Sequence, residues 1–241
     1  MRGLTALDTV AVWETAYRLH PIDRVLSLLL QVMADHSRET LAALPLSERD
    51  SLLLALRSAT FGDALPGKSN CPRCGETVEF TLSCREFAPQ AKPRLRQVER
   101  DGYKATIRPL TSYDLAASAN AATLREARAL LLERCVAGAS YNDESIEAKW
   151  LPEEIQHAIS EIVAETDPQA EMLINLNCPK CGQQWQILLD IGHILWLEIS
   201  SRAQRLLMEV HLLAKAYGWT EEEILKLSGQ RRSAYLQMVM A

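Results

Sequence analysis

The sequence contains the motif Cys-Pro-x-Cys-Gly twice, at residues 71–75 and again at 178–182. An alternating run of hydrophobic residues follows each copy at the same distance from its first cysteine. The residues are Val78, Phe80 and Leu82 after the first copy, and Trp185, Ile187 and Leu189 after the second. A period of two is typical of a β-strand with one buried face. The chain therefore repeats a unit of a tight cysteine turn followed by a strand.

Two cysteines at positions i and i+3 of a tight turn supply half of a tetrahedral zinc site. The proline narrows the backbone choices, and the glycine permits the turn. Redox-active Cys-x-x-Cys pairs sit at a helix start in a βαβ unit, which neither copy has. We therefore predict one structural Zn²⁺ held by Cys71, Cys74, Cys178 and Cys181. Four thiolates close the coordination shell, so a catalytic role is not expected.

The two motifs lie much further apart than the ~15–20 residues of common zinc sites of this kind. Closing a loop of about 100 residues costs on the order of 5 kcal/mol. Structural zinc supplies roughly 10–16 kcal/mol, so the metal can close it. The pattern predicts a split zinc ribbon with a long insert between its halves.

The fold class that we expect is α+β and mainly helical, with helical arms on both sides of the ribbon. Capping boxes are indicated at Thr5 with Asp8 and at Ser47 with Asp50. Pro21 suits the first turn of a helix reaching Val32, and Gly62 suits a helix end. The segments that we expect are an N-terminal arm (1–66), the first ribbon half (67–92), the insert (93–174), the second half (175–192) and a C-terminal arm (193–241).

The insert should open with a hairpin turning at Asp101-Gly102. A helix should follow from Thr111, and 126–136 and 151–165 read as two more. Residues 85–108 contain seven basic and three acidic residues, whereas 143–171 contain nine acidic residues and one lysine. We interpret this segregation as two stretches that face each other or are solvated.

The formal net charge of −5 and the pI of about 5.6 argue against a nucleic-acid-binding protein. No segment has the ~18 apolar residues that a membrane helix needs. The first twenty residues lack the features of a signal peptide. Six cysteines without a secretion signal favour metal binding in the reducing cytoplasm, which is the expected location.

Residues 62–69, GDALPGKS, formally match the phosphate-binding P-loop. That motif must follow a strand and open a helix. Here it follows a predicted helix and runs into Cys71, so we interpret it as a linker. No other catalytic motif is present, and we expect a protein that is not an enzyme.

Cys84 could replace a zinc ligand, whereas Cys135 lies in an apolar helical run and should be packed. The five histidines show no metal-binding spacing. A long amphipathic helix should run from Leu195 to Gly218, with two shorter helices after it, one of them capped by Thr220 with Glu223. The candidate partner surface consists of residue types that dominate interfaces: Tyr217, Trp219, Arg231, Arg232 and Tyr235. The alternative is that Tyr217 and Trp219 simply pack between helices.

Several segments together resemble a family of phage and bacterial proteins. They are residues 47–62, the first motif with its strand (71–80), the RPLTSYDL stretch at 108–115, the second motif and residues 209–239. The order of these segments is similar to that of baseplate hub assembly proteins of T-even-like phages and contractile injection systems. The resemblance implies a non-enzymatic assembly factor or component, some relatives being chaperones, that binds baseplate hub or tail-tube proteins. A zinc-ribbon protein that binds nucleic acid or transcription machinery is the alternative.

Overall fold

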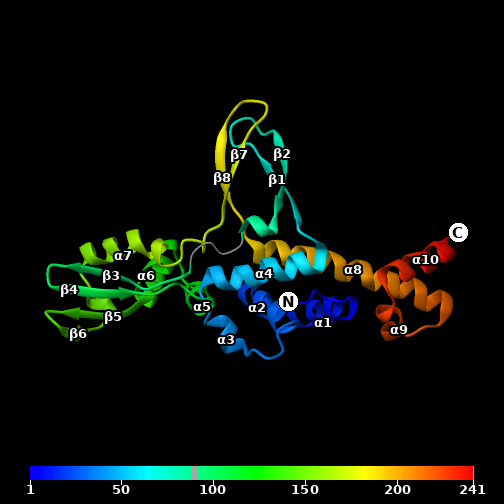
Figure 1. The fold of residues 1–241 in the computed structure, drawn as a ribbon, viewed down its shortest axis with the longest axis horizontal. Coiled ribbons are helices and arrows are strands. Elements are labelled where there is room, and N and C mark those ends of the chain that lie inside the picture. Colours follow the sequence, from blue (N-terminus) through cyan, green and yellow to red (C-terminus); the bar gives the residue numbers. More distant parts are fainter. Residues whose placement is uncertain (88–91, 241) are drawn as a thin grey trace. The chain divides into compact units, whose positions relative to one another are not determined.

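The structure is a computed structural model that describes residues 1–87 and 92–240 (Figure 1). The chain forms two compact units. The terminal unit comprises Met1–His36, Ala55–Asp63 and the chain from Asp190 onward. The hairpin unit comprises Ser37–Leu54 and Ala64–Leu189.

The terminal unit is helical. It contains α1 (Ala6–Ala16), α2 (Pro21–Leu30), the end of α4 (Leu46–Phe61), α8 (Ile191–Tyr217), α9 (Glu221–Lys226) and α10 (Gly229–Met240). One cluster of its core joins Ala6 and Val10 of α1 to Leu206 of α8 and Leu225 of α9. Burying these apolar side chains stabilises the helices, which would be marginal alone.

The local signals for these helices are largely confirmed. Thr5 and Asp8 form the expected capping box, and so do Thr220 and Glu223. Pro21 occupies the first turn of α2, although that helix ends at Leu30, before Val32. The long helix ends at Gly218, which adopts the left-handed conformation with φ +70°.

The capping box predicted at Ser47 with Asp50 is wrong. Helix α4 begins at Leu46, so Ser47 already lies inside it. The backbone N–H of Ser47 donates to the carboxylate of Asp167 at 3.0 Å, and Asp50 accepts from Arg49 at 2.7 Å. A residue 120 positions away thus satisfies a helix N-terminus for which a local cap was predicted.

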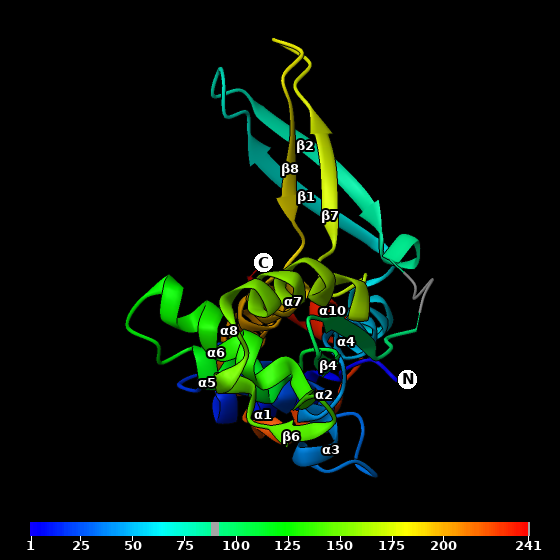
Figure 2. The same ribbon diagram turned by 90° about the vertical axis from the view of Figure 1, so that its left-hand side faces the viewer.

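The hairpin unit contains α3 (Arg38–Ala42), the start of α4 and two separate β-hairpins. The first hairpin pairs β1 (Ala64–Asn70) with β2 (Thr77–Ser83), and a short 3₁₀ turn, η1 (Cys84–Phe87), follows. The second hairpin pairs β7 (Leu173–Asn177) with β8 (Gln184–Leu188). Figure 2 shows the two hairpins lying across each other.

The insert between the hairpins is built on a four-stranded antiparallel sheet in the order β3-β4-β5-β6. Its strands are β3 (Arg96–Arg100), β4 (Tyr103–Ile107), β5 (Val136–Tyr141) and β6 (Glu144–Ile146). Its helices are α5 (Ser112–Ser118), α6 (Leu124–Cys135), η2 (Ala148–Trp150) and α7 (Glu153–Thr166). The predicted turn is confirmed, because Asp101 and Gly102 have φ values of +52° and +78°. The strands β5 and β6 were not predicted.

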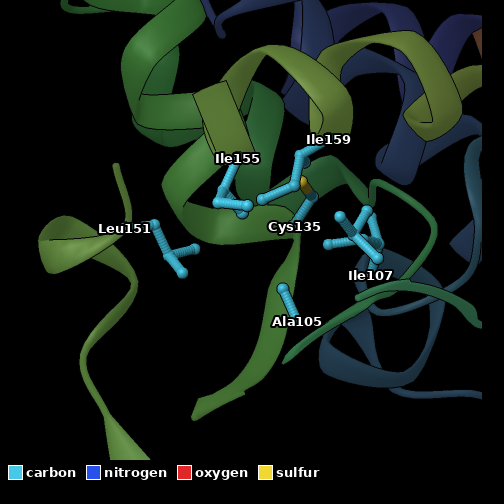
Figure 3. Packing of buried hydrophobic residues seen from close by; sticks show 7 residues of the cluster. Ala105, Ile107, Cys135, Leu151, Ile155 and Ile159 are labelled. Atoms are coloured by element: carbon cyan, nitrogen blue, oxygen red, sulfur yellow. The ribbon is translucent and has the colours of Figure 1, made fainter. Parts of the chain in front are cut away.

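The core of the insert lies between this sheet and its helices. Ala105 and Ile107 of β4 meet Cys135 at the end of α6 and the isoleucines of α7, as Figure 3 shows. Ile155 and Ile159 are one helical turn apart and point to the same side. The insert therefore has an apolar core of its own.

The basic and acidic stretches of the insert face each other, which is one of the two arrangements that the sequence predicted. Arg96 of β3 pairs with Glu165 of α7 at 3.1 Å. Lys104 of β4 likewise pairs with Asp143 at 3.2 Å.

Asp114 belongs to neither stretch. It is fully buried and accepts from Arg108 at 2.7 Å and from Arg134 at 2.9 Å. Burial raises the pKa of Asp114, but the bonds from Arg108 and Thr111 outweigh it and hold the pKa below its usual range.

Within the residues that the structure describes, none of the helices combines the length and the apolar character that a membrane crossing requires.

Candidate metal centre

The two hairpins are equivalent from their first strands onward. When each is counted from its first cysteine, β1 matches β7 and β2 matches β8, with the same pairing. Lys68 lies opposite Glu79 in the first hairpin, and Asn175 lies opposite Gln186 at the matching place in the second. The repeat is thus longer than the sequence indicated, since it includes a strand before each motif.

Each cysteine motif forms the turn of its hairpin. In the first, the N–H of Cys71 donates to the carbonyl of Glu76 at 2.8 Å, and the N–H of Gly75 donates to the carbonyl of Cys71 at 2.9 Å. The second motif repeats both bonds at 2.9 and 3.0 Å. Gly75 and Gly182 have φ values of +74° and +71°, a conformation that favours glycine. This backbone geometry, which the two turns share, explains why both motifs end in glycine.

The two turns bring the four cysteines of the repeat together. Their sulfur atoms all lie within 4.8 Å of one another. Cys71 lies 3.6 Å from Cys181, and Cys74 lies 3.6 Å from Cys178. Exchanging the hairpins turns one of these pairs into the other, so the cluster has an approximate two-fold symmetry.

The spacing fits a tetrahedral metal site. Thiolates about 2.3 Å from a central zinc ion lie about 3.8 Å from one another, close to the 3.6 Å observed. A disulfide would need a sulfur–sulfur distance of about 2.05 Å. The arrangement of Cys71, Cys74, Cys178 and Cys181 could therefore hold a metal ion.

The electrostatics of the cluster favour a cation. Burial raises the pKa of Cys71, but backbone N–H donors of Cys74 and Arg73 and the Cys181 thiol lower it to about 7. A backbone N–H lowers the pKa of Cys74, but burial and the other thiols outweigh it and raise this pKa to about 12. One thiolate forms readily, and its charge then opposes the next. A divalent cation would offset that repulsion.

Two further contacts join the hairpins beside the cysteines. Lys180 of the second turn pairs with Glu76 of the first at 3.0 Å. Trp185 donates from its indole Nε1 to the Ser69 hydroxyl at 3.3 Å. The ion pair is exposed and contributes little by itself.

The P-loop-like segment is a strand and not the linker that was predicted. Gly62 ends α4 with φ +94°, and Ala64–Asn70 form β1, which leaves no helix to receive a phosphate. Lys68 pairs across the hairpin with Glu79 at 2.6 Å. A Cβ atom on Gly67 would lie 2.4 Å from the ring of Phe80, so this glycine makes room for the aromatic ring.

The two other cysteines lie apart from the cluster. Cys84 is buried in η1, and Cys135 is fully buried in the insert core. The Cys135 thiol donates to the carbonyl of Leu132 at 3.1 Å, and burial raises its pKa to about 11. The only group of potential metal ligands found among the described residues is the four-cysteine cluster.

The candidate partner residues at the C-terminus contact one another. The rings of Tyr217 and Trp219 stack at 4.7 Å, and Tyr235 meets the Trp219 ring edge-on at 4.9 Å. Arg232 is buried and donates to Glu209 at 2.8 Å and to a backbone carbonyl, whereas Arg231 is exposed. The Arg232 side chain is therefore buried among the C-terminal helices, and a partner could not reach it.

These features define a mixed α+β protein in which four cysteines from two hairpins lie close together and could hold a metal ion. A family model described as T4 bacteriophage base plate protein matches residues 15–196, and the chain belongs to that family. Comparison with curated proteins and with solved structures gave no match. The C-terminal aromatic residues lie beyond the matched range.

Proposed function

We propose that this protein is a non-enzymatic assembly factor or component for the baseplate hub of a contractile phage tail or contractile injection system. Membership of the base plate family over residues 15–196 carries the proposal. The ordered resemblance of segments at 47–62, 108–115 and 209–239 supports the narrower hub assignment. Where it acts as a chaperone, it would work in the cytoplasm before the particle is complete.

We further propose that the four-cysteine centre is a split zinc ribbon that binds one structural Zn²⁺. The sulfur spacing and the approximate two-fold symmetry support zinc, whose preferred geometry is tetrahedral. Cys71 and Cys74 would supply two thiolates from one hairpin, and Cys178 and Cys181 two from the other. The ion would neutralise charge and fix geometry, since four thiolates leave no position for a substrate.

The position of the centre supports a framework role. The insert leaves the first hairpin after Ser83 and returns to the second at Leu173. Joining the hairpins at their turns therefore fixes both ends of a long insert. An assembly factor needs such a frame, because recognition surfaces are more precise on rigid elements.

The partners that we propose are baseplate hub or tail-tube proteins. The candidate contact surface at the C-terminus is the exposed part of the cluster formed by Tyr217, Trp219, Tyr235 and the neighbouring Arg231. Aromatic and arginine side chains dominate interface energetics, which supports the assignment. The nucleic-acid alternative has less support, because the basic stretch of the insert is partly engaged by α7 through Arg96 and Glu165.

Native mass spectrometry tests both proposals together. The tagged protein is purified without chelator from cells that also express the neighbouring tail genes. We expect one zinc ion per chain and the added mass of a hub or tail-tube protein. A zinc-free chain would contradict the ribbon, whereas a zinc-loaded chain carrying nucleic acid would favour the alternative. Binding to nucleic acid would also weaken steeply with salt.

Three variants separate the metal from the partner. Cys181→Ala should lose zinc and, with it, the ordered hairpins, whereas Cys84→Ala should retain zinc because Cys84 lies outside the cluster. Arg231→Ala should retain zinc and weaken only the complex. If Arg231→Ala and Cys84→Ala bound the partner equally well, the C-terminal surface would not be the contact.

A further inference from the structure

The two equivalent hairpins differ on the faces that they turn outward. Both have the same turn, the same strand pairing and inward-facing apolar residues. The exposed cross-strand pairs of the first hairpin are Pro66–Thr81, Lys68–Glu79 and Asn70–Thr77. The matching pairs of the second are Leu173–Leu188, Asn175–Gln186 and Asn177–Gln184. The outward face of the first hairpin carries a charged pair and a proline, whereas that of the second carries amides and leucines.

The second hairpin lacks the charges and prolines with which natural sheets protect their free edges. Its ten strand residues include no charge and no proline, whereas natural sheets protect free edges with lysine, charge pairs or proline. Leu173 is 48% exposed and its cross-strand partner Leu188 is 59% exposed. In the part of the chain that the structure describes, β7 and β8 pair only with each other.

This contrast points to a function for the outward face. The metal centre and inward packing impose the same demands on both hairpins, so they cannot explain why one face is charged and the other is not. Lys68 and Glu79 also show that a charged pair fits this position of the fold. An uncharged pair at Asn175 and Gln186 would suit contact with another uncharged surface.

We propose that the outward face of β7–β8 binds the same face of a second copy of this chain. Side-chain amides both donate and accept hydrogen bonds, so an amide face is complementary to itself. The Gln186 amide already donates to Asn175 at 2.9 Å within one chain, which holds both side chains in place. In a two-fold pair, leucine can meet leucine, amide can meet amide, and no like charges oppose each other.

The face is small, which sets the strength of the contact. Stable complexes bury about 800 Å² per partner, more than one side of a five-residue hairpin offers. We therefore expect a dissociation constant on the order of 100 µM. Such a contact becomes effective where several copies are held in one assembly, because the local concentration is then high.

Sedimentation equilibrium of the full zinc-loaded chain tests the proposal. Loading concentrations should span a hundredfold range and reach about 500 µM, so that a weak dimer is populated. The test variant is Leu188→Glu, and its matched control is Thr81→Glu, which adds the same charge at the equivalent exposed position of the other hairpin. We expect Leu188→Glu to raise the dimer dissociation constant at least about tenfold, and Thr81→Glu to change it less than about twofold.

Gln186→Glu is a second test variant, because Glu79 already occupies the equivalent position without disturbing the fold. It should also weaken the dimer, and zinc content should be unchanged in all three variants. A wild-type chain that remains monomeric over the whole range would overturn the proposal and favour an uncharged segment of another protein as the occupant. A dimer that Leu188→Glu and Thr81→Glu weaken equally would also overturn it.

Discussion

The sulfur atoms of Cys71 and Cys181 lie 3.6 Å apart although 110 positions separate them in the chain. The approximate two-fold symmetry of the hairpins gives Cys74 and Cys178 the same separation. A cysteine pair from one motif thus faces a pair from the other, and neither motif forms a site alone.

Removing one ligand should abolish tight metal binding. In Cys181→Ser, three thiolates remain, and most of the roughly 10–16 kcal/mol of a structural zinc site should be lost with the closed geometry. We expect less than one zinc per ten chains after dialysis, measured by elemental mass spectrometry. Cys135→Ala is the matched control, since its thiol is buried in the insert core. Equal zinc content in both variants would contradict the assignment of ligands.

Asp114 should make the stability of the insert depend on pH. Its folded-state pKa is lowered, so it contributes stability above the unfolded value of about 3.9, and that stability is lost as pH falls through the folded pKa. Asp114→Asn should destabilise the protein by about 3 kcal/mol at pH 7. The difference between wild type and variant should shrink below about pH 4. Urea unfolding at several pH values measures both effects.

The control for Asp114 is Asp143→Asn, since Asp143 pairs with Lys104 but is 86% exposed. An exposed pair contributes about 0–1 kcal/mol, so this variant should resemble the wild type. If the two variants were equally stable, the buried network would not have the role assigned to it.

Gly67 should resist substitution because Phe80 covers it. Gly67→Ala places a Cβ atom 2.4 Å from the Phe80 ring, so the ring must move. We expect a loss of about 1 kcal/mol from this overpacking. Phe80→Leu should reduce the loss, which a double-mutant cycle measures. Gly138→Ala, where nothing lies within 4 Å of the added atom, should be neutral, and a similar loss there would contradict the explanation.

Neighbouring arginines at the C-terminus should behave differently. Arg232→Ala removes a buried guanidinium and leaves Glu209 without its partner, which should cost about 2–3 kcal/mol. Arg231→Ala changes an exposed side chain and should cost less than about 0.5 kcal/mol. Thermal unfolding of the two variants measures the difference. A comparable loss for both would show that Arg231 also has a structural role.

The sequence was sufficient to predict elements with local signals. The spacing of the cysteines predicted which four thiols would meet, and Asp101-Gly102 predicted a hairpin turn. Gly62 and Gly218 marked helix ends correctly, because positive φ values favour glycine.

Elements that depend on pairing with another segment could not be predicted in the same way. Residues 64–70 contain proline, glycine and lysine, which are poor strand formers, yet they form β1 because β2 supplies its hydrogen-bond partners. The small residues of 136–141 become β5 because they pair with β4. The start of α4 likewise depends on Asp167, a partner that no local pattern indicates.

The buried state of Arg232 was also beyond local patterns. Its neighbour Arg231 is chemically identical, and only the direction of each side chain on α10 separates them. Glu209, on another helix, determines which of the two is engaged.

The strand before each cysteine turn has a consequence for how such proteins can diversify. The first hairpin is complete before the chain enters the insert, and the second lies entirely after it. The four-cysteine cluster therefore contains no residue between Ser83 and Leu173. The insert also has an apolar core of its own. Evolution, or a protein engineer, could therefore exchange this module for a different fold whose two ends lie a similar distance apart and keep the two cysteine hairpins unchanged.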